Sequence, residues 1–281
     1  MNITNPFLDP SRQAELYGHA SRLTGRSNAL LRAKTSGRPV PDAIVQLVRA
    51  HHERPGRLGL VLDVGCGRGT SSMALAEQLR PRHVIGLDAA PALIEQARRR
   101  ARHVPGLQLS FLRGDFHQIP LPTSSCDVAV AAFCLYHSTH PQKVIAELGR
   151  VLRPEGLAVL VTKDLDSYQE MDELVAAAGL DLRATGHESL YVSAHSGNLA
   201  SLVSPSLDVL RTEDEEHSFT FDGHDHVAEY LATNPKYHLP PGLYGNPGAV
   251  AAALRDILPD RPLTTRSVVT FVVARPTGGR S

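Results

Sequence analysis

Three glycines and two aspartates in the first third of the chain have the clearest chemical potential. Gly65, Gly67 and Gly69 alternate directly after a short apolar run. Glycine allows sharp backbone turns and lets a ligand approach main-chain N–H groups closely. Asp63 lies two residues before the first glycine of this loop, and Asp88 ends a second apolar run. The pattern predicts a strand, a tight loop and a helix that together hold a nucleotide-like cofactor.

The spacing of these glycines differs from the dinucleotide-binding fingerprint G-x-G-x-x-G. That fingerprint would place its third glycine at position 70, where the chain has Thr70, and the third glycine is Gly69 instead. An acid about 20 residues beyond such a loop suits hydrogen bonds to ribose hydroxyls. Asp88 occupies that place in the chain.

Five segments in a fixed order resemble the class I S-adenosylmethionine-dependent methyltransferases. They are residues 63–69, 86–88, 114–115, 127–137 and 152–156. A glycine triplet alone is a weak signal, whereas five motifs in the family's order and spacing are specific. The resemblance is close over residues 60–164. It implies S-adenosylmethionine as the cofactor and S-adenosylhomocysteine as the product.

The resemblance also implies roles for single residues. Asp63 would act through the glycine loop on the methionine amino group, and Asp88 would accept from the two ribose hydroxyls. Asp115 and the backbone N–H of Phe116 would contact the adenine, and Tyr17 of an N-terminal helix would cover the cofactor carboxylate. The expected cofactor-binding residues are Tyr17, Asp63, Gly65, Cys66, Gly67, Asp88, Ala89, Leu93, Gly114, Asp115, Phe116 and Phe133.

Histidines and tyrosines supply the predicted catalytic and acceptor-binding residues. Methyl transfer from a sulfonium requires alignment and exclusion of water, and it needs a base only where the acceptor must lose a proton. His137 follows the fourth predicted strand and is the predicted general base, because histidine titrates near neutral pH; His117 is the second choice. The predicted acceptor contacts are His137, Tyr230, Tyr237, His238 and Tyr244. The alternative is that the aromatic residues among them only pack a cap.

Apolar periodicity predicts the elements that position these residues. The expected strands cover residues 60–64, 83–87, 108–113, 127–133 and 157–163. Helices between them indicate a doubly wound, Rossmann-like α/β fold with a mostly parallel sheet. The resemblance implies seven strands with one antiparallel, and Arg266–Ala274 suits the final one. The expected parts are an N-terminal helical lid (1–55), the core (56–189), an inserted substrate cap (190–258), and the final strand with a tail (259–281).

Composition narrows the class of function. The chain has 29 basic and 29 acidic residues, which argues against a nucleic-acid partner. It contains no long apolar run and no secretory signal at its N-terminus, so we expect a cytoplasmic protein without a membrane partner. Three scattered cysteines fit a reducing compartment. No histidine, cysteine and carboxylate group has a convincing metal spacing, so no metal is expected.

The sequence therefore predicts a methyltransferase for a small-molecule acceptor, present as a monomer or homodimer. A composition rich in Ala, Arg, Leu, Pro and Gly indicates a high-GC bacterial genome, which together with the expected cap favours a specialised-metabolite pathway such as antibiotic biosynthesis. O-methylation is the first expectation, because hydroxyl acceptors are common and a histidine base is available. Three alternatives stay open. One is a non-methylating reaction on the same fold, such as cyclisation or decarboxylation. The others are an RNA or protein methyltransferase, and a non-catalytic protein that binds S-adenosylmethionine.

Overall fold

The structure is a computed structural model that describes residues 5–18, 20–52, 56–104, 106 and 108–278, and the side chains of residues 20–22 lie outside the description. Contacts between residues divide the chain into two compact units. The helical unit comprises Met1–Gly37, Asp164–Val192 and Glu215–Val268. The sheet unit comprises Arg38–Lys163, Ser193–Asp214 and Val269–Ser281. The expected boundary between lid and core, at residues 55 and 56, lies at the edge of the undescribed residues 53–55.

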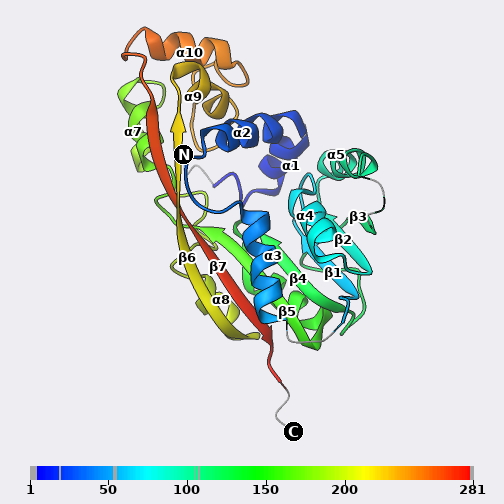
Figure 1. Ribbon diagram of the computed structural model, residues 1–281. Coiled ribbons are helices and arrows are strands. Elements are labelled where there is room, and N and C mark those ends of the chain that lie inside the picture. The colour runs from blue at the N-terminus through cyan, green and yellow to red at the C-terminus, as the bar shows by residue number, and fades with distance from the viewer. Residues whose placement is uncertain (1–4, 19, 53–55, 105, 107, 279–281) are drawn as a thin grey trace. The chain divides into compact units, whose positions relative to one another are not determined.

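A seven-stranded sheet carries the site, in the strand order β3-β2-β1-β4-β5-β7-β6 (Figure 1). Its strands are β1 (Leu60–Val64), β2 (His83–Asp88), β3 (Leu109–Arg113), β4 (Cys126–Ala132), β5 (Leu152–Lys163), β6 (Leu207–Phe221) and β7 (Leu263–Pro276). The pairs β1–β2, β1–β4, β2–β3 and β4–β5 are parallel, and β7 is antiparallel to β5. The predicted Rossmann-like sheet with one antiparallel strand is confirmed.

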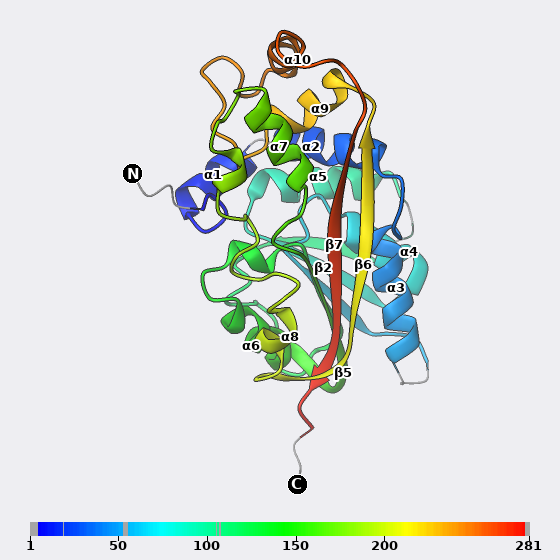
Figure 2. The ribbon, with the colours of Figure 1, turned by 90° about the vertical axis from the view of Figure 1, so that its left-hand side faces the viewer.

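Helices cover both faces of this sheet. The helical elements of the sheet unit are α3 (Val40–His51), α4 (Thr70–Leu79), α5 (Pro91–Arg102), the 3₁₀ turn η1 (Leu135–His137), α6 (Pro141–Val151) and α8 (Leu199–Val203). Ile44 of α3 and Leu75 of α4 share one buried cluster with Val128 and Val130 of β4. Figure 2 shows α6 and α8 on the other side of the sheet from α3 and α4. Because both faces are covered, β4 is an almost continuous apolar run.

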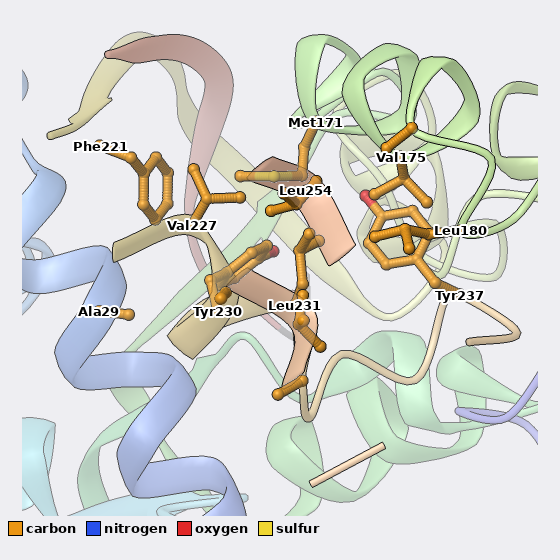
Figure 3. Packing of buried hydrophobic residues seen from close by; sticks show 14 of the residues in the cluster. Ala29, Met171, Val175, Leu180, Phe221, Val227, Tyr230, Leu231, Tyr237 and Leu254 are labelled. Carbon is orange, nitrogen blue, oxygen red and sulfur yellow. The ribbon is translucent and has the colours of Figure 1, made fainter. Parts of the chain in front are cut away.

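The helical unit has an apolar core of its own. Its elements are α1 (Pro10–Gly18), α2 (Ala20–Ala33), the 3₁₀ turn η2 (Ala184–Gly186), α7 (Gln169–Ala177), α9 (His224–Leu231) and α10 (Pro247–Arg255). Met171, Phe221, Leu231 and Leu254 are completely buried and lie together in this core (Figure 3). Among the described residues, no helix has both the length and the apolar composition needed to cross a membrane.

Two features differ from the sequence prediction, namely the strand β6 and the division of the predicted cap between the two units. The chain forms a 15-residue strand, β6, inside the predicted cap of residues 190–258. The acidic residues Glu213–Glu216 obscured it, because an edge strand keeps charged side chains in solvent and lacks a purely apolar pattern. Contacts also divide the predicted cap between the two units, since residues 193–214 join the sheet unit.

Candidate cofactor and acceptor site

The glycine loop between β1 and α4 requires glycine for two separate reasons. Gly65, Gly67 and Gly69 have φ values of +60°, +53° and +77°, in the left-handed region that favours glycine. In addition, a Cβ atom on Gly65 would lie 2.3 Å from Cβ of Cys134. The loop is fixed to the end of β2 because the N–H of Cys66 donates to the carbonyl of Leu87 at 3.0 Å. Backbone atoms of the loop thus lie close to the carboxyl ends of β1 and β2.

One aromatic ring positions this loop against β2. The ring of Phe111 on β3 is buried, and it occupies the space that a Cβ atom would need at Gly69 and at Gly86. The corresponding distances to the ring are 2.7 Å for Gly69 and 2.6 Å for Gly86. The sequence motifs Gly65–Gly69 and Gly86–Asp88 are therefore joined by packing as well as by hydrogen bonds.

Asp88 is held in one orientation by the backbone. Its Oδ2 accepts from the N–H of Gly67 and its Oδ1 accepts from the N–H of Ala90, both at 2.8 Å. A carboxylate has about four lone-pair positions, so each oxygen keeps one for a further donor. Burial raises the pKa of Asp88, and these two hydrogen bonds oppose that rise. The arrangement fits a ligand with two neighbouring hydroxyls, such as a ribose.

Asp63 is a second, deeper carboxylate. It is almost fully buried at the end of β1, and its Oδ2 accepts from the Ser72 hydroxyl of α4 at 2.5 Å. Burial raises the pKa of Asp63 to about 7; the nearby Asp88 adds to the rise and Ser72 opposes it. A buried and a partly buried carboxyl group, both with raised pKa values, favour a cationic ligand. A cofactor with an amino group and a ribose therefore matches the chemistry of this loop.

Asp115, His117 and Ser138 form a hydrogen-bonded chain at the predicted adenine position. The ring Nδ1 of His117 lies 2.7 Å from Oδ1 of Asp115, and Nε2 lies 2.7 Å from Oγ of Ser138. Burial raises the pKa of Asp115, but the hydrogen bonds from the backbone and ring of His117 outweigh it and leave the pKa below its usual value. Because both ring nitrogens already have partners, His117 is poorly placed to act as a base. Sequence reasoning missed Ser138.

His137 lies in η1, immediately beyond β4. Its ring is partly buried, and Nδ1 lies 3.2 Å from the carbonyl oxygen of Cys134. A proton on Nδ1 that is donated to this carbonyl leaves Nε2 as the basic nitrogen of the neutral ring. Phe133, just before this turn, has a φ of +56°, and Nζ of Lys163 lies 5.2 Å from the centre of its ring. Such left-handed conformations in bulky residues are strained and concentrate at functional sites.

The remaining predicted cofactor residues of the sheet unit differ in burial and in packing contacts. Leu93 is buried on α5, and Ala89 is exposed beside Asp88. Gly114 packs against Leu87, since a Cβ atom there would lie 2.7 Å from a Leu87 methyl. Phe116 is partly buried and makes an edge contact with the ring of His117. Burial raises the pKa of the Cys66 thiol, so this cysteine packs without acting as a thiolate.

The predicted acceptor residues other than His137 all belong to the helical unit. Tyr230 and Tyr237 are each 4% exposed and pack in its core (Figure 3). They line a cavity of about 10 Å³, which has room for one water molecule. The Tyr237 hydroxyl donates to Oδ1 of Asp172 at 2.7 Å. These rings therefore form core contacts in this structure, which is the alternative that the sequence left open.

His238, Tyr244 and Tyr17 are more accessible. The His238 side chain is 47% exposed, and Tyr244 is 38% exposed. Tyr17 lies on α1 and is partly buried. The predicted cofactor residues other than Tyr17 belong to the sheet unit, whereas these three residues belong to the helical unit.

Comparison with known proteins agrees with this geometry. Residues 61–156 match the methyltransferase domain family. A transposon protein of Streptomyces fradiae is 41% identical over 115 residues, which are 41% of this chain and 32% of that protein. A malonyl-[acyl-carrier protein] O-methyltransferase of Serratia marcescens is 34% identical over 115 residues, which are 40% of this chain and 42% of that protein. The matches thus span less than half the length of these relatives.

Solved structures share the fold over a longer stretch. A candidate methyltransferase from Bacillus halodurans superposes with a TM-score of 0.57 and 16% identity, covering 84% of this chain and 99% of that one. The [4+2]-cyclase SpnF superposes with a TM-score of 0.52 and 22% identity, covering 84% of this chain and 81% of that one. At such identities the likeness concerns the fold alone.

The glycine loop, the two aspartates, the strand order and the family match define a methyltransferase domain of the class I type. S-adenosylmethionine is the cofactor of this class, which agrees with the cofactor expected from the sequence.

Proposed function

We propose that the protein transfers a methyl group from S-adenosylmethionine to a small-molecule acceptor. The observation that carries the proposal is the orientation of the Asp88 carboxylate beside the glycine loop. Its two oxygens accept hydrogen bonds from two backbone N–H groups, each with an N···O distance of 2.8 Å. This arrangement leaves one lone pair on each oxygen for a ribose diol. When bound, the cofactor supplies a sulfonium methyl that is ready for in-line displacement.

The residues of the chain bind and orient the donor in this proposal. Asp63 and Asp88 balance the positive charge of the ligand, and the Gly65–Gly69 loop lets its backbone approach the methionine and ribose. Asp115 accepts from the adenine amino group, while His117 and Ser138 keep its carboxylate in place. Phe133 lies where β4 ends, at the mouth that an acceptor would use.

His137 is the proposed general base for an acceptor that carries a hydroxyl. Its hydrogen bond to the Cys134 carbonyl orients the ring and favours the tautomer with a basic Nε2. O-methylation is therefore the reaction that we favour over N- or C-methylation. The malonyl-[acyl-carrier protein] O-methyltransferase of Serratia marcescens also carries out an O-methylation by name, which supports this preference.

The first test is the affinity of the protein for its cofactor, measured by calorimetric titration of the purified full chain. Asp88→Ala should weaken binding of S-adenosylhomocysteine by about 100-fold or more, because two charge-assisted hydrogen bonds of at least ~1.5 kcal/mol each are lost. Asp208→Ala is the control, since this exposed residue lies outside the proposed site. Unchanged affinity in Asp88→Ala protein with an unaltered circular dichroism spectrum would contradict the cofactor assignment.

Product mass distinguishes methyl transfer from other chemistry on the same fold. Acceptor pools incubated with the protein and S-adenosylmethionine should give products heavier by one methylene. A rearrangement such as a cyclisation is the alternative on the same fold, and it leaves the substrate mass unchanged. Loss of mass would indicate decarboxylation.

A further inference from the structure

Two histidines and an aspartate lie close together in the helical unit, whereas the cofactor loop belongs to the sheet unit. Asp181, His187 and His238 each offer one ligand atom, and these atoms all lie within 4.8 Å of one another. Among the residues that the structure describes, no other group of three or more His, Cys, Asp or Glu side chains meets this description. The three residues come from two separate loops, after α7 and after α9.

Asp181 holds the group together. Its Oδ2 lies 2.6 Å from Nε2 of His187 and 3.8 Å from Nδ1 of His238. Its side chain is only 7% exposed, and it also accepts from the backbone N–H groups of His238 at 2.7 Å and of Arg183 at 3.1 Å. These hydrogen bonds fix the position of the carboxylate oxygens.

The two imidazoles lie close to this oxygen and to each other. Their rings lie edge to face, with centres 4.7 Å apart and planes at 78°. Around a zinc ion, ligands at ~2.0–2.2 Å in tetrahedral positions lie about 3.4 Å from one another. The two measured separations from Oδ2, 2.6 Å and 3.8 Å, bracket that value. Small side-chain movements would give three zinc ligands.

We propose that Asp181, His187 and His238 bind a divalent transition metal ion, with Zn²⁺ as the best fit to two imidazoles and one carboxylate. The inference is independent of the proposed methyltransferase activity. His187 is 11% exposed and His238 is 47% exposed, so the group opens to solvent on the His238 side. A water molecule has access from there as the fourth ligand.

The ion would join two loops that also form the wall of the small cavity. Ser189 and Tyr191 follow His187 closely, Lys236 and Tyr237 immediately precede His238, and all four line that cavity. Bound metal would therefore fix both walls of the cavity relative to each other. The positions of the three ligands in the sequence, 181, 187 and 238, do not indicate a metal site. The three side chains meet only because the two loops lie next to each other in the folded helical unit.

The test uses the untagged full chain, stripped of metal with a chelator. Co²⁺ titration should give one equivalent of binding with the visible absorption of a four-coordinate site, and Zn²⁺ should displace it. Saturating Zn²⁺ should raise the Tm by about 5 °C or more, because binding at 100-fold excess over Kd stabilises the folded state. His238→Ala changes an exposed side chain and should lose both effects, and His187→Gln should do the same.

His103→Ala is the matched control, because this histidine is exposed and lies outside the group. It should bind Co²⁺ as the unaltered protein does. Two outcomes would overturn the proposal: the unaltered protein binds no Co²⁺ or Zn²⁺, or the His238→Ala and His187→Gln proteins bind as well as it does. In either case the three side chains form only a hydrogen-bonded group. Cofactor titration of the same samples shows separately whether the proposed function holds.

Discussion

Two carboxyl groups at the ends of neighbouring parallel strands determine the chemistry of the candidate site. Asp63 lies one residue before the end of β1, and Asp88 ends β2. Asp63 accepts from the Ser72 hydroxyl of α4, and Asp88 accepts from the N–H groups of Gly67 and Ala90. Burial raises the pKa values of both, and with its pKa raised to about 7 Asp63 is partly protonated near neutral pH. A cationic ligand binds the ionised form, and binding is therefore coupled to proton release.

This coupling predicts how cofactor affinity depends on pH. The pKa of Asp63 in the free site is about 7. Below this value a proton competes with the cationic amino group, so affinity for S-adenosylhomocysteine should fall about tenfold per pH unit well below pH 7. Calorimetry between pH 5.5 and 7.5 measures the slope. Asp63→Asn should bind weakly with a flat profile, and an equally flat profile in the unaltered protein would contradict the role of Asp63.

The same shift has an opposite consequence for the free protein. The pKa of Asp63 is higher in the folded state than in the unfolded chain. The folded protein therefore binds the Asp63 proton more tightly than the unfolded chain does. The stabilisation from this tighter proton binding is lost as the pH rises from about 4 to about 7. Thermal stabilisation by S-adenosylhomocysteine should accordingly grow over the same range.

Replacing the proposed base should separate turnover from cofactor binding. His137→Ala should lower kcat by about 100-fold or more with a hydroxyl acceptor, since general-base catalysis contributes ~10²–10⁴-fold. The affinity for S-adenosylhomocysteine should change little. Rates measured across pH should also lose the limb that reports the histidine. Normal turnover of His137→Ala with the true acceptor would remove His137 from the mechanism.

At the scale of elements, the loop between β1 and α4 depends on what each glycine contacts. Gly65 and Gly67 have nearly the same left-handed φ, +60° and +53°. A Cβ atom on Gly65 would lie 2.3 Å from Cβ of Cys134, whereas nothing lies within 4 Å of the corresponding position on Gly67. The two positions are therefore a natural pair for separating steric overlap from backbone strain.

Alanine at these two positions should destabilise the protein to different extents. Gly67→Ala should cost about 1–2 kcal/mol, the usual penalty of a left-handed alanine. Gly65→Ala should cost clearly more, because Cβ of Cys134 cannot move without its backbone. Urea denaturation followed by circular dichroism measures both. Cys134→Gly in the Gly65→Ala background should recover part of the loss, and equal costs at the two positions would contradict the steric argument.

At the scale of the whole molecule, the chain is shared between two units. The sheet unit holds the cofactor loop and His137, and the helical unit holds Tyr17 and the predicted acceptor tyrosines. The long strands β6 and β7 have residues in both units. A ligand of the sheet unit could thus act on stability well beyond its own contacts.

Hydrogen exchange with and without S-adenosylhomocysteine should reveal how far the bound cofactor reaches. Amides of residues 65–69, 88–90 and 114–117 should gain protection, because a ligand that binds the folded state suppresses local opening. Protection of α1 in addition would support the role of Tyr17 as a cover for the cofactor carboxylate. The Asp88→Ala protein should show no protection at the same ligand concentration. Protection confined to the helical unit would place the cofactor elsewhere.

The sequence by itself determined the sheet and its cofactor loop. Apolar runs that end in Asp63 and Asp88 predict buried parallel strands, and their carboxyl ends lie at one edge of the sheet. The alternating glycines predicted the turn because left-handed backbone conformations favour glycine. These features depend on local patterns, which is why the fold class and the loop could be predicted before the structure was known.

Only the tertiary structure decided the features that depend on contacts between distant segments. β6 was missed because its acidic residues lie on an edge strand. The Asp115–His117–Ser138 chain joins two loops, and the Asp181–His187–His238 group joins two others. The sequence predicted Tyr230 and Tyr237 as acceptor contacts, with packing of the cap as the alternative, and both side chains are buried in the structure. A sequence pattern records which side chains are present, whereas burial and pairing follow from how the segments pack.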